Sequence, residues 1–366
     1  MRKLATIRTI RELTPIEGAD LIVLATVDDW KVVVKKDEFS VGDKCVYFEI
    51  DSFLPDGNPA WQHLVDKHPR MFEGQRGHKL RSVKLRGQLS QGFVIPLSHE
   101  IEVEWSHTFK NFEGARSLEV GDDVTDMLGV VKFEAPVPAE LAGQIRGNFP
   151  SFIKKTDQER CQNLGHEIFV ENKDAVYEVS MKLDGTSFTG YFNHGIEGVC
   201  GRNWELKTDD SNAFNTLVLM FVESGLRDAL REFGGNYAVQ GELMGPGIQK
   251  NREGFTSHKL FVFDIYDIDN GCYVAPFKRH EILNMLYVHG LNKTMVAHVP
   301  ILHDAIKLSE ISGRHTRRII DVAALLEYAE GPSIHHPIRE GLVYKRSDGG
   351  FSFKTISNRF LLKEED

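Results

Sequence analysis

The stretch Glu178-Val179-Ser180-Met181-Lys182-Leu183-Asp184-Gly185-Thr186-Ser187 stands near the middle of a 366-residue chain. Its apolar pattern predicts a strand from Ala175 to Leu183. The segment Lys182-Leu183-Asp184-Gly185 therefore lies where this strand ends. A K-x-D-G match alone is modest support for chemistry, because average residue usage produces one by accident in roughly one chain in ten of this length.

Further segments follow this lysine in a fixed order: Gly241-Glu242-Leu243-Met244-Gly245-Pro246-Gly247-Ile248-Gln249-Lys250-Asn251, Phe261-Val262-Phe263-Asp264-Ile265, Glu340-Gly341-Leu342-Val343-Tyr344-Lys345 and Phe351-Ser352-Phe353-Lys354. The last two flank a turn at 348–350, which predicts a β-hairpin with strands at 342–345 and 351–356. This hairpin brings Glu340 and Lys354 onto neighbouring strands.

Judged singly, some residues of these segments have plainer interpretations. Phe263 alternates with Phe261 in an apolar strand, which is typical of a core position. Glu242 fits an exposed strand residue, and Lys354 fits a solvated hairpin residue. The combination of all segments in this order and spacing is what indicates a shared site.

The length of the chain favours two domains, since domains of roughly 100 to 200 residues are the norm. The first part holds short β-rich runs at Leu21 to Val27, Trp30 to Lys35, Lys44 to Ile50 and Gly92 to Ile95. They predict a small barrel of the OB type over residues 1–130, which either binds nucleic acid or serves as a packing partner. Prolines and glycines then break the chain at 131–150, where we expect a linker.

Residues 151–366 mix strand and helix patterns, which predicts an α+β second domain. Apolar spacing predicts one helix from Ser211 to Phe233, ended by Gly234 and Gly235. Further helices are predicted at 279–289 and 317–330.

The formal net charge of −9 does not favour a broadly basic, nucleic-acid-binding surface. Any nucleic-acid site must therefore be local. The segment between Gly74 and Ser98 contains no acidic residue. It supplies candidate RNA-binding cations, although a solvated loop is the plainer interpretation. These candidates are Lys79, Arg81, Lys84 and Arg86.

The four cysteines lie far apart without a C-x-x-C spacing, which favours neither a zinc site nor a disulfide framework. The longest strongly apolar run, Leu217 to Val222, is far shorter than the roughly 20 residues of a membrane span. We therefore expect a cytoplasmic protein that does not enter the membrane.

Taken together, the segments around Lys182 resemble the nucleotidyltransferase motifs of ATP-dependent RNA ligases, in particular the nick-sealing family with an N-terminal OB module. Residues 150–163 and 80–97 resemble the flanking signatures of that family. The resemblance implies an OB-type β-barrel followed by an ATP-grasp-like nucleotidyltransferase domain with antiparallel sheets and flanking helices. It also implies joining of 3′-OH and 5′-phosphate RNA ends through lysyl-AMP and adenylylated RNA, at nicks in duplexes, by a monomer.

The resemblance also assigns roles. It implies that Lys182 is the nucleophile, that Phe263 stacks on adenine, that Glu242 contacts ribose and that Lys354 contacts the α-phosphate. Arg202 and Lys345 are further expected nucleotide contacts. From their position before the nucleophile strand, we also hypothesise that Lys155 and Arg160 hold the departing pyrophosphate.

A free lysine has a pKa near 10.4, so only about one in a thousand is the neutral amine at neutral pH. Neighbouring carboxylates raise that pKa further. The presence of Asp184, Glu242 and Glu340 around Lys182 therefore makes sense only if they hold a hydrated Mg²⁺ or Mn²⁺. We expect these carboxylates to contact the ion through its water molecules.

Two rival enzyme classes are a DNA ligase and an RNA-capping guanylyltransferase; a non-enzyme alternative is a nucleic-acid-binding protein with a dead transferase domain. DNA ligases typically carry an arginine where this chain has Ser187. Both rivals carry an OB domain after the last motif, whereas only residues 355–366 follow Lys354 here. The chain departs from many RNA ligases at Ile356. Those ligases have a second lysine two residues after the position of Lys354, and Lys363 could take its place here.

Overall fold

The computed structural model describes residues 2–97, 117–134, 143–213, 215–311 and 318–364. The chain divides into two compact units, Met1–Pro136 with Leu361–Asp366, and Val137–Phe360. Within the described residues, no helix has the length and apolar character needed to cross a membrane.

The first unit contains a sheet with the strand order β10-β4-β1-β2-β3. Its strands are β1 (Ala5–Pro15), β2 (Ile22–Val27), β3 (Trp30–Lys35), β4 (Lys44–Phe48) and β10 (Phe93–Pro96). Residues Ala5 to Thr9 of β1 pair with β4, and the pairing with β2 begins at Ile10 and shifts register between Ile10 and Glu12. Bulges bend a strand, which lets β1 serve both halves of a curved sheet.

A second sheet of this unit has the order β11-β5-β7-β6, and β8 pairs with β9. These elements are β5 (Ser52–Pro55), α1 (Gln62–Lys67), β6 (Arg70–Phe72), β7 (Gln75–Lys79), β8 (Val83–Leu85), β9 (Gln88–Ser90) and β11 (Val131–Lys132). The core is rich in aromatic pairs: Trp30 stacks on Tyr47 at 5.7 Å, and Phe48 meets the edge of Trp61 at 5.4 Å. Such large buried rings dominate the packing energy of a small β unit.

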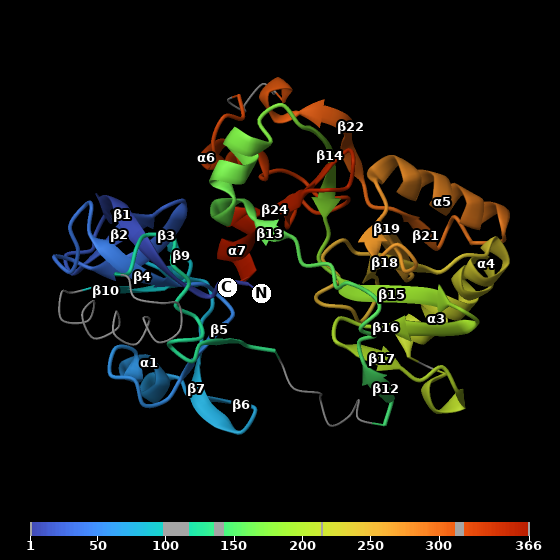
Figure 1. Ribbon diagram of the computed structural model, residues 1–366, viewed down its shortest axis with the longest axis horizontal. Coiled ribbons are helices and arrows are strands. Elements are labelled where there is room, and N and C mark those ends of the chain that lie inside the picture. Colours follow the sequence, from blue (N-terminus) through green and yellow to red (C-terminus); the bar gives the residue numbers. More distant parts are fainter. Residues whose placement is uncertain (1, 98–116, 135–142, 214, 312–317, 365–366) are drawn as a thin grey trace. The chain divides into compact units, whose positions relative to one another are not determined.

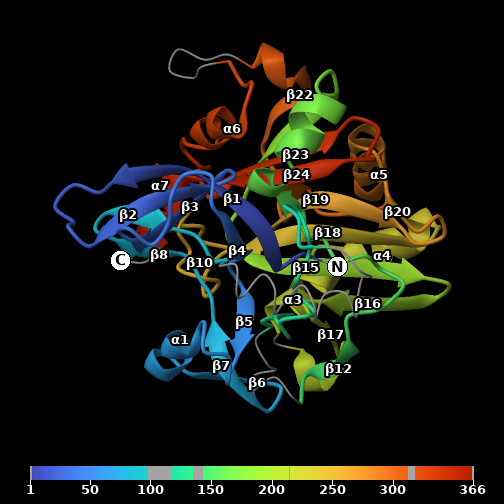
Figure 2. The same cartoon turned by 60° about the vertical axis from the view of Figure 1, so that its left-hand side comes forward.

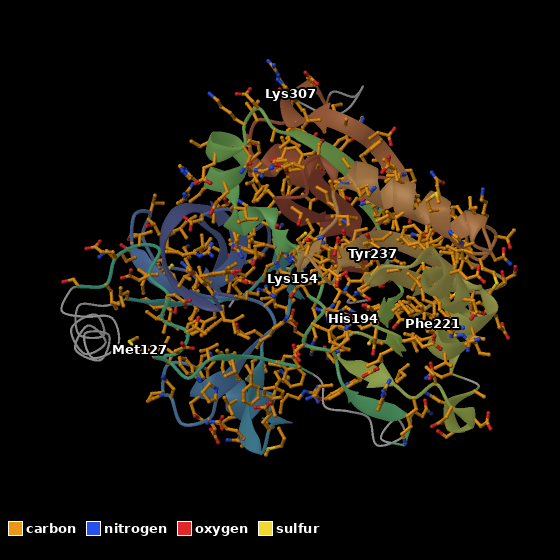
Figure 3. The ribbon with its side chains drawn as sticks, turned by 45° about the vertical axis from the view of Figure 1, so that its right-hand side comes forward. Met127, Lys154, His194, Phe221, Tyr237 and Lys307 are labelled. Atoms are coloured by element: carbon orange, nitrogen blue, oxygen red, sulfur yellow. The ribbon has the colours of Figure 1, made fainter. Side chains whose placement is uncertain are left out.

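The second unit contains a larger sheet with the order β12-β17-β16-β15-β18-β19-β20, with β21 parallel to β19 (Figures 1 and 2). Its strands are β12 (Ile145–Asn148), β15 (Thr186–Asn193), β16 (Ile196–Cys200), β17 (Trp204–Leu206), β18 (Tyr237–Met244), β19 (Lys259–Asp267), β20 (Cys272–Tyr273) and β21 (Val296–His298). The helices α3 (Thr216–Glu223), α4 (Leu226–Phe233) and α5 (Pro276–Val288) share one core with this sheet. Phe221 lies inside that core (Figure 3).

A smaller sheet of the same unit has the order β13-β24-β23-β14-β22. Its elements are β13 (Glu159–Arg160), β14 (Val176–Lys182), β22 (Ile301–Lys307), β23 (Gly341–Arg346) and β24 (Ser352–Ile356), followed by α7 (Asn358–Glu364). The helix α6 (Val322–Tyr328) packs on it through Val322, Ala324 and Leu325. Short helical turns occur at Cys161–Asn163, Glu167–Glu171, Asp210–Asn212 and Leu308–Glu310. The predicted strand before Lys182 and the predicted hairpin are confirmed.

The single helix predicted from Ser211 to Phe233 is wrong. The chain forms α3 and α4 instead, and the break lies at Ser224 and Gly225. Gly225 has a φ of 76°, a left-handed conformation that glycine adopts at no steric cost. The Ser224 hydroxyl donates to the Met220 carbonyl at 2.5 Å and accepts from the Leu226 N–H at 3.3 Å, so it ends one helix and begins the next.

Candidate active site

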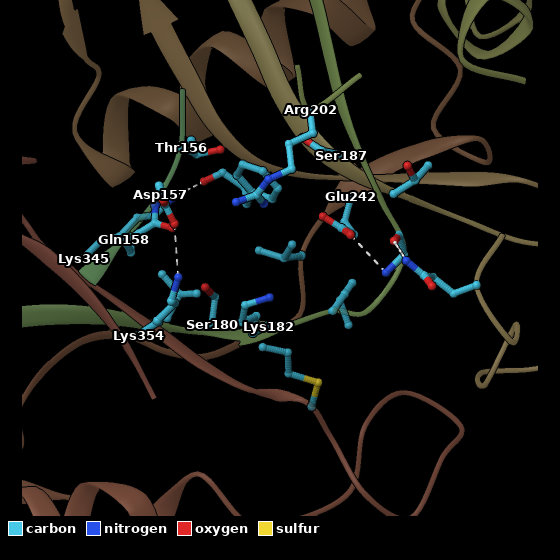
Figure 4. A pocket seen from close by; sticks show the side chains of 18 residues that line it. Thr156, Asp157, Gln158, Ser180, Lys182, Ser187, Arg202, Glu242, Lys345 and Lys354 are labelled. Carbon is cyan, nitrogen blue, oxygen red and sulfur yellow. Dashed lines mark hydrogen bonds and ion pairs between the residues drawn. The ribbon is translucent and has the colours of Figure 1, made fainter. Parts of the chain in front are cut away.

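A pocket of about 280 Å³ lies between the two sheets of the second unit (Figure 4). Strands β14, β23 and β24 supply residues on one side, and β15, β18 and β19 supply residues on the other. Of the residues predicted to form the site, those lining it are Lys182, Arg202, Glu242, Phe263, Lys345 and Lys354. Residues separated by more than 170 positions in the sequence thus share one space.

Lys182 is the last residue of β14, and its Nζ lies 2.6 Å from Glu340 Oε1. Burial acts to lower the pKa of Lys182, but Glu340, Glu242 and Asp184 outweigh it and raise the pKa above its usual value. With these carboxylates as its neighbours, the side chain is held as an ammonium ion. Added positive charge near these carboxylates would favour the neutral amine.

Two glycines of the motifs are required by close backbone approaches. A Cβ at Gly185 would lie 2.5 Å from the Leu243 carbonyl oxygen, and a Cβ at Gly341 would lie 2.0 Å from the Thr355 carbonyl oxygen. The Gly185 N–H also donates to Glu242 Oε1 at 2.9 Å. The glycines that follow Asp184 and Glu340 therefore let the strands meet closely enough to gather the carboxylates.

The carboxylates suit a hydrated divalent cation. Burial raises the pKa of Glu242 to about 7, with the negative charge of Glu340 adding to the effect although Lys182 opposes it. Glu340 Oε2 is buried and has no hydrogen-bond partner among the described residues. No three His, Cys, Asp or Glu side chains of the described part cluster closely enough to ligate a metal directly. Contact through the waters of a hydrated ion fits this donor set.

Lys354 projects from β24 and pairs with Asp157, with 3.3 Å between Nζ and Oδ1 (Figure 4). Burial lowers the pKa of Lys354 to about 8, and the positive charges of Lys182 and Arg160 contribute although Asp157 opposes them. Arg160 lies opposite Lys354 in the parallel pair of β13 and β24. Lys182 and Lys354 are therefore among the cations that line the pocket, and Arg160 lies next to Lys354 on the neighbouring strand.

Phe263 lies on β19, and it is half-buried beside the pocket rather than enclosed in a core. The Lys345 Nζ lies 5.7 Å from the centre of its ring and donates to its carbonyl oxygen. Lys345 also pairs with Asp264 at 2.7 Å between Nζ and Oδ1. Phe263 therefore gives the pocket wall an aromatic side chain, of the kind that can stack on a planar base.

Lys155 and Arg160 do not line the pocket. The Lys155 Nζ donates to Asn203 Oδ1 at 3.1 Å and lies 5.6 Å from the centre of the Phe149 ring. Sequence reasoning did not single out further residues that do line the pocket, namely Thr156, Asp157, Gln158, Ser180, Ser187 and Gln249. For Thr156, Asp157 and Gln158, the one sequence feature that indicated a site was their position directly after Lys155.

The candidate RNA-binding residues lie in the first unit. Lys79, on β7, is half-buried with its Nζ 3.5 Å from Asp51 Oδ1 and 4.8 Å from the centre of the Phe133 ring. The other candidates, Arg81, Lys84 and Arg86, are exposed. The side chain of Lys363 lies outside the described residues.

Comparisons with known proteins identify the family. A family model described as an OB-fold domain matches residues 4–97, and one described as RNA ligase matches residues 175–359. No curated protein matches the chain. Among solved structures, an RNA ligase variant from Naegleria gruberi with AMP and Mn is 43% identical over 100% of both chains, with a TM-score of 0.80.

Other structures of that Naegleria gruberi RNA ligase match equally fully. A variant with ATP and Mn is 43% identical with a TM-score of 0.81, and the protein with PPi is 43% identical with a TM-score of 0.80; each match covers 100% of both chains. The predicted OB fold and the α+β architecture of antiparallel sheets with helices are confirmed. The chain belongs to the RNA ligase family.

Proposed function

We propose that the protein is an ATP-dependent RNA ligase that joins 3′-OH and 5′-phosphate ends at nicks in duplexes, through lysyl-AMP and adenylylated RNA. The observation that carries this proposal is the contact of 2.6 Å between Lys182 Nζ and Glu340 Oε1 at the end of β14, beside a pocket lined by Phe263 and Lys354. The Naegleria gruberi structures with ATP, AMP and PPi support it.

In the first step, the lone pair of Lys182 Nζ attacks the α-phosphorus of ATP. A phosphorus–nitrogen bond forms, the bond to the pyrophosphate oxygen breaks, and the amine proton passes to solvent. The ammonium of Lys354 offsets the negative charge that grows on the α-phosphate oxygens. Lys182 must be neutral beforehand, although its carboxylate neighbours raise its pKa.

Asp184, Glu242 and Glu340 would hold a hydrated Mg²⁺ or Mn²⁺ through water. When bound, the ion supplies positive charge that favours the neutral amine of Lys182 and the negative charge on phosphate. Burial raises the pKa of Glu242, and Glu340 Oε2 has no hydrogen-bond partner among the described residues, so Lys182 alone does not satisfy this group of carboxylates.

In the second step, an oxygen of the RNA 5′-phosphate attacks the same phosphorus, the bond to Lys182 breaks, and the amine takes up a proton. In the third step, the RNA 3′-hydroxyl oxygen attacks the 5′-phosphorus and its proton passes to solvent. A phosphodiester forms, the bond to the AMP oxygen breaks, and AMP leaves. The side chains that bind the nucleotide in step one can hold the AMP group until it leaves in step three.

The nucleotide contacts follow from the walls of the pocket. We assign the base to the Phe263 ring, the ribose to Glu242 and the phosphates to the cations Arg202, Lys345 and Lys354. Arg160 lies beside Lys354 and is suited to the pyrophosphate. Lys155 could contact the pyrophosphate only by releasing its hydrogen bond to Asn203. If Lys155→Ala forms lysyl-AMP at the wild-type rate, Lys155 has no role in holding the pyrophosphate.

Incubation of the purified protein with ATP and Mg²⁺ or Mn²⁺, followed by intact-mass spectrometry, tests the first step. The expected product is protein carrying one adenylyl group, absent from Lys182→Ala and present in Lys173→Ala, which removes an exposed lysine of the same unit. A panel of nicked duplexes then tests sealing. Labelling from GTP instead of ATP would favour a capping enzyme, and sealing of nicks made only of DNA would favour a DNA ligase.

A further inference from the structure

A set of buried charges lies behind the pocket, and of its members only Lys345 has been given a part in the mechanism above. Glu178 on β14 and Lys345 on β23 are cross-strand partners in the smaller sheet. Their side chains are 2% and 8% exposed. Directly opposed residues of paired strands point to the same face of a sheet, so an anion and a cation stand side by side there.

The layer of the larger sheet presents the opposite charges. Arg279, on α5, places its Nη2 2.6 Å from Glu178 Oε2. Asp264, on β19, places its Oδ1 2.7 Å from Lys345 Nζ. The two ion pairs run in opposite directions between the layers, so sliding one layer past the other would break both or bring like charges together.

Stability alone does not account for this arrangement. Arg279 is fully buried, and its Nε and Nη1 atoms, like Glu178 Oε1, have no hydrogen-bond partner among the described residues. Incompletely satisfied buried ion pairs often contribute less to stability than apolar residues of similar volume. Their directional contacts do, however, restrict how two packed layers can be placed.

The ion pairs connect directly to the pocket walls. Lys345 lines the pocket and donates to the carbonyl oxygen of Phe263 on the opposite layer. Glu178 lies on the same strand as Lys182. We propose that Glu178 and Arg279 are positioning residues for adenylyl transfer, which act through Lys345 to fix the placement of Phe263 relative to Lys182. This inference rests on the proposed function.

Single-turnover formation of lysyl-AMP at saturating ATP tests it, because the rate constant and the fraction of protein labelled are measured separately. We expect Arg279→Met to lower the rate constant at least tenfold while most of the folded protein is still labelled, since small misplacements of reacting groups slow transfer strongly. Arg279→Lys should recover part of the rate. Arg231→Met, which removes an exposed arginine paired with Glu197, should match the wild type.

If Arg279→Met fails to fold, Glu178→Gln tests the same contact, because it keeps the side-chain shape and removes the charge. Wild-type rate constants in the folded variants, with any loss confined to the labelled fraction, would show a purely structural role and overturn the inference. A wild-type protein that forms no lysyl-AMP would instead refute the proposed function itself.

Discussion

Lys354 is a cation held in surroundings that disfavour its charge. Burial lowers its pKa to about 8, so raising the pH from 7 to 9 removes its proton. We expect the wild-type affinity for ATP to fall up to about tenfold over this range, because only about one in ten Lys354 side chains remains charged one pH unit above the pKa. Lys354→Arg stays charged and should show a flatter profile by calorimetry. Parallel profiles for the two proteins would contradict this role.

Gly341 provides a test of the close approach between β23 and β24. A Cβ there would lie 2.0 Å from the Thr355 carbonyl oxygen, so Gly341→Ala must push the strands apart. We expect a loss of about 1–3 kcal/mol in the free energy of unfolding, measured with denaturant, together with slower lysyl-AMP formation. Gly147→Ala on β12 has open space and serves as the control. Equal stability of the two variants would exclude the steric argument.

The sequence was sufficient for residues that lie in local motifs, and insufficient for their partners. The order of segments placed Lys182, Glu242 and Phe263 in one site because motif spacing is a property of the chain itself. The contact of Lys354 with Asp157 joins residues 197 positions apart, and that of Arg279 with Glu178 joins residues 101 apart. No periodicity encodes such pairs, since they depend on how the sheets meet.

At the scale of elements, the break between α3 and α4 was missed because the apolar spacing continues through it. The structure shows that Gly225 has a left-handed φ of 76° and that a Cβ there would lie 2.8 Å from the Gly290 carbonyl oxygen. We expect Gly225→Ala to destabilise the second unit by about 1–3 kcal/mol, because both the backbone conformation and the contact resist a side chain. A thermal unfolding midpoint equal to that of the wild type would argue against this.

The strands were predicted where they alternate cleanly and missed where they do not. Runs at β2 and β3 are apolar and rich in β-branched residues, which is typical of half-buried strands, and β4 is a short apolar run that is buried along most of its length. The long strand β1 escaped notice because its second half is largely exposed and polar and contains a bulge. Strand β7 carries Arg76, His78 and Lys79, so it resembled a solvated loop.

At the scale of the whole molecule, the exposed candidate RNA-binding residues belong to the first unit and the pocket belongs to the second. Neutralising Arg81, Lys84 and Arg86 to glutamine should weaken binding to a nicked duplex and flatten its salt dependence, while lysyl-AMP formation stays unchanged. The matched control neutralises Lys3, Lys35 and Lys36, which are exposed cations of the same unit. Equal loss of RNA binding in both triple variants would point to net charge rather than to a local site.

The central claim is that the Lys182 amine captures an adenylyl group when a divalent cation offsets the surrounding carboxylates. Peptide mapping of the protein after incubation with ATP and Mn²⁺ tests it most directly. We expect AMP on Lys182 alone, with none after chelation of the metal. Adenylylation at another residue, or nick sealing by Lys182→Ala, would contradict this account.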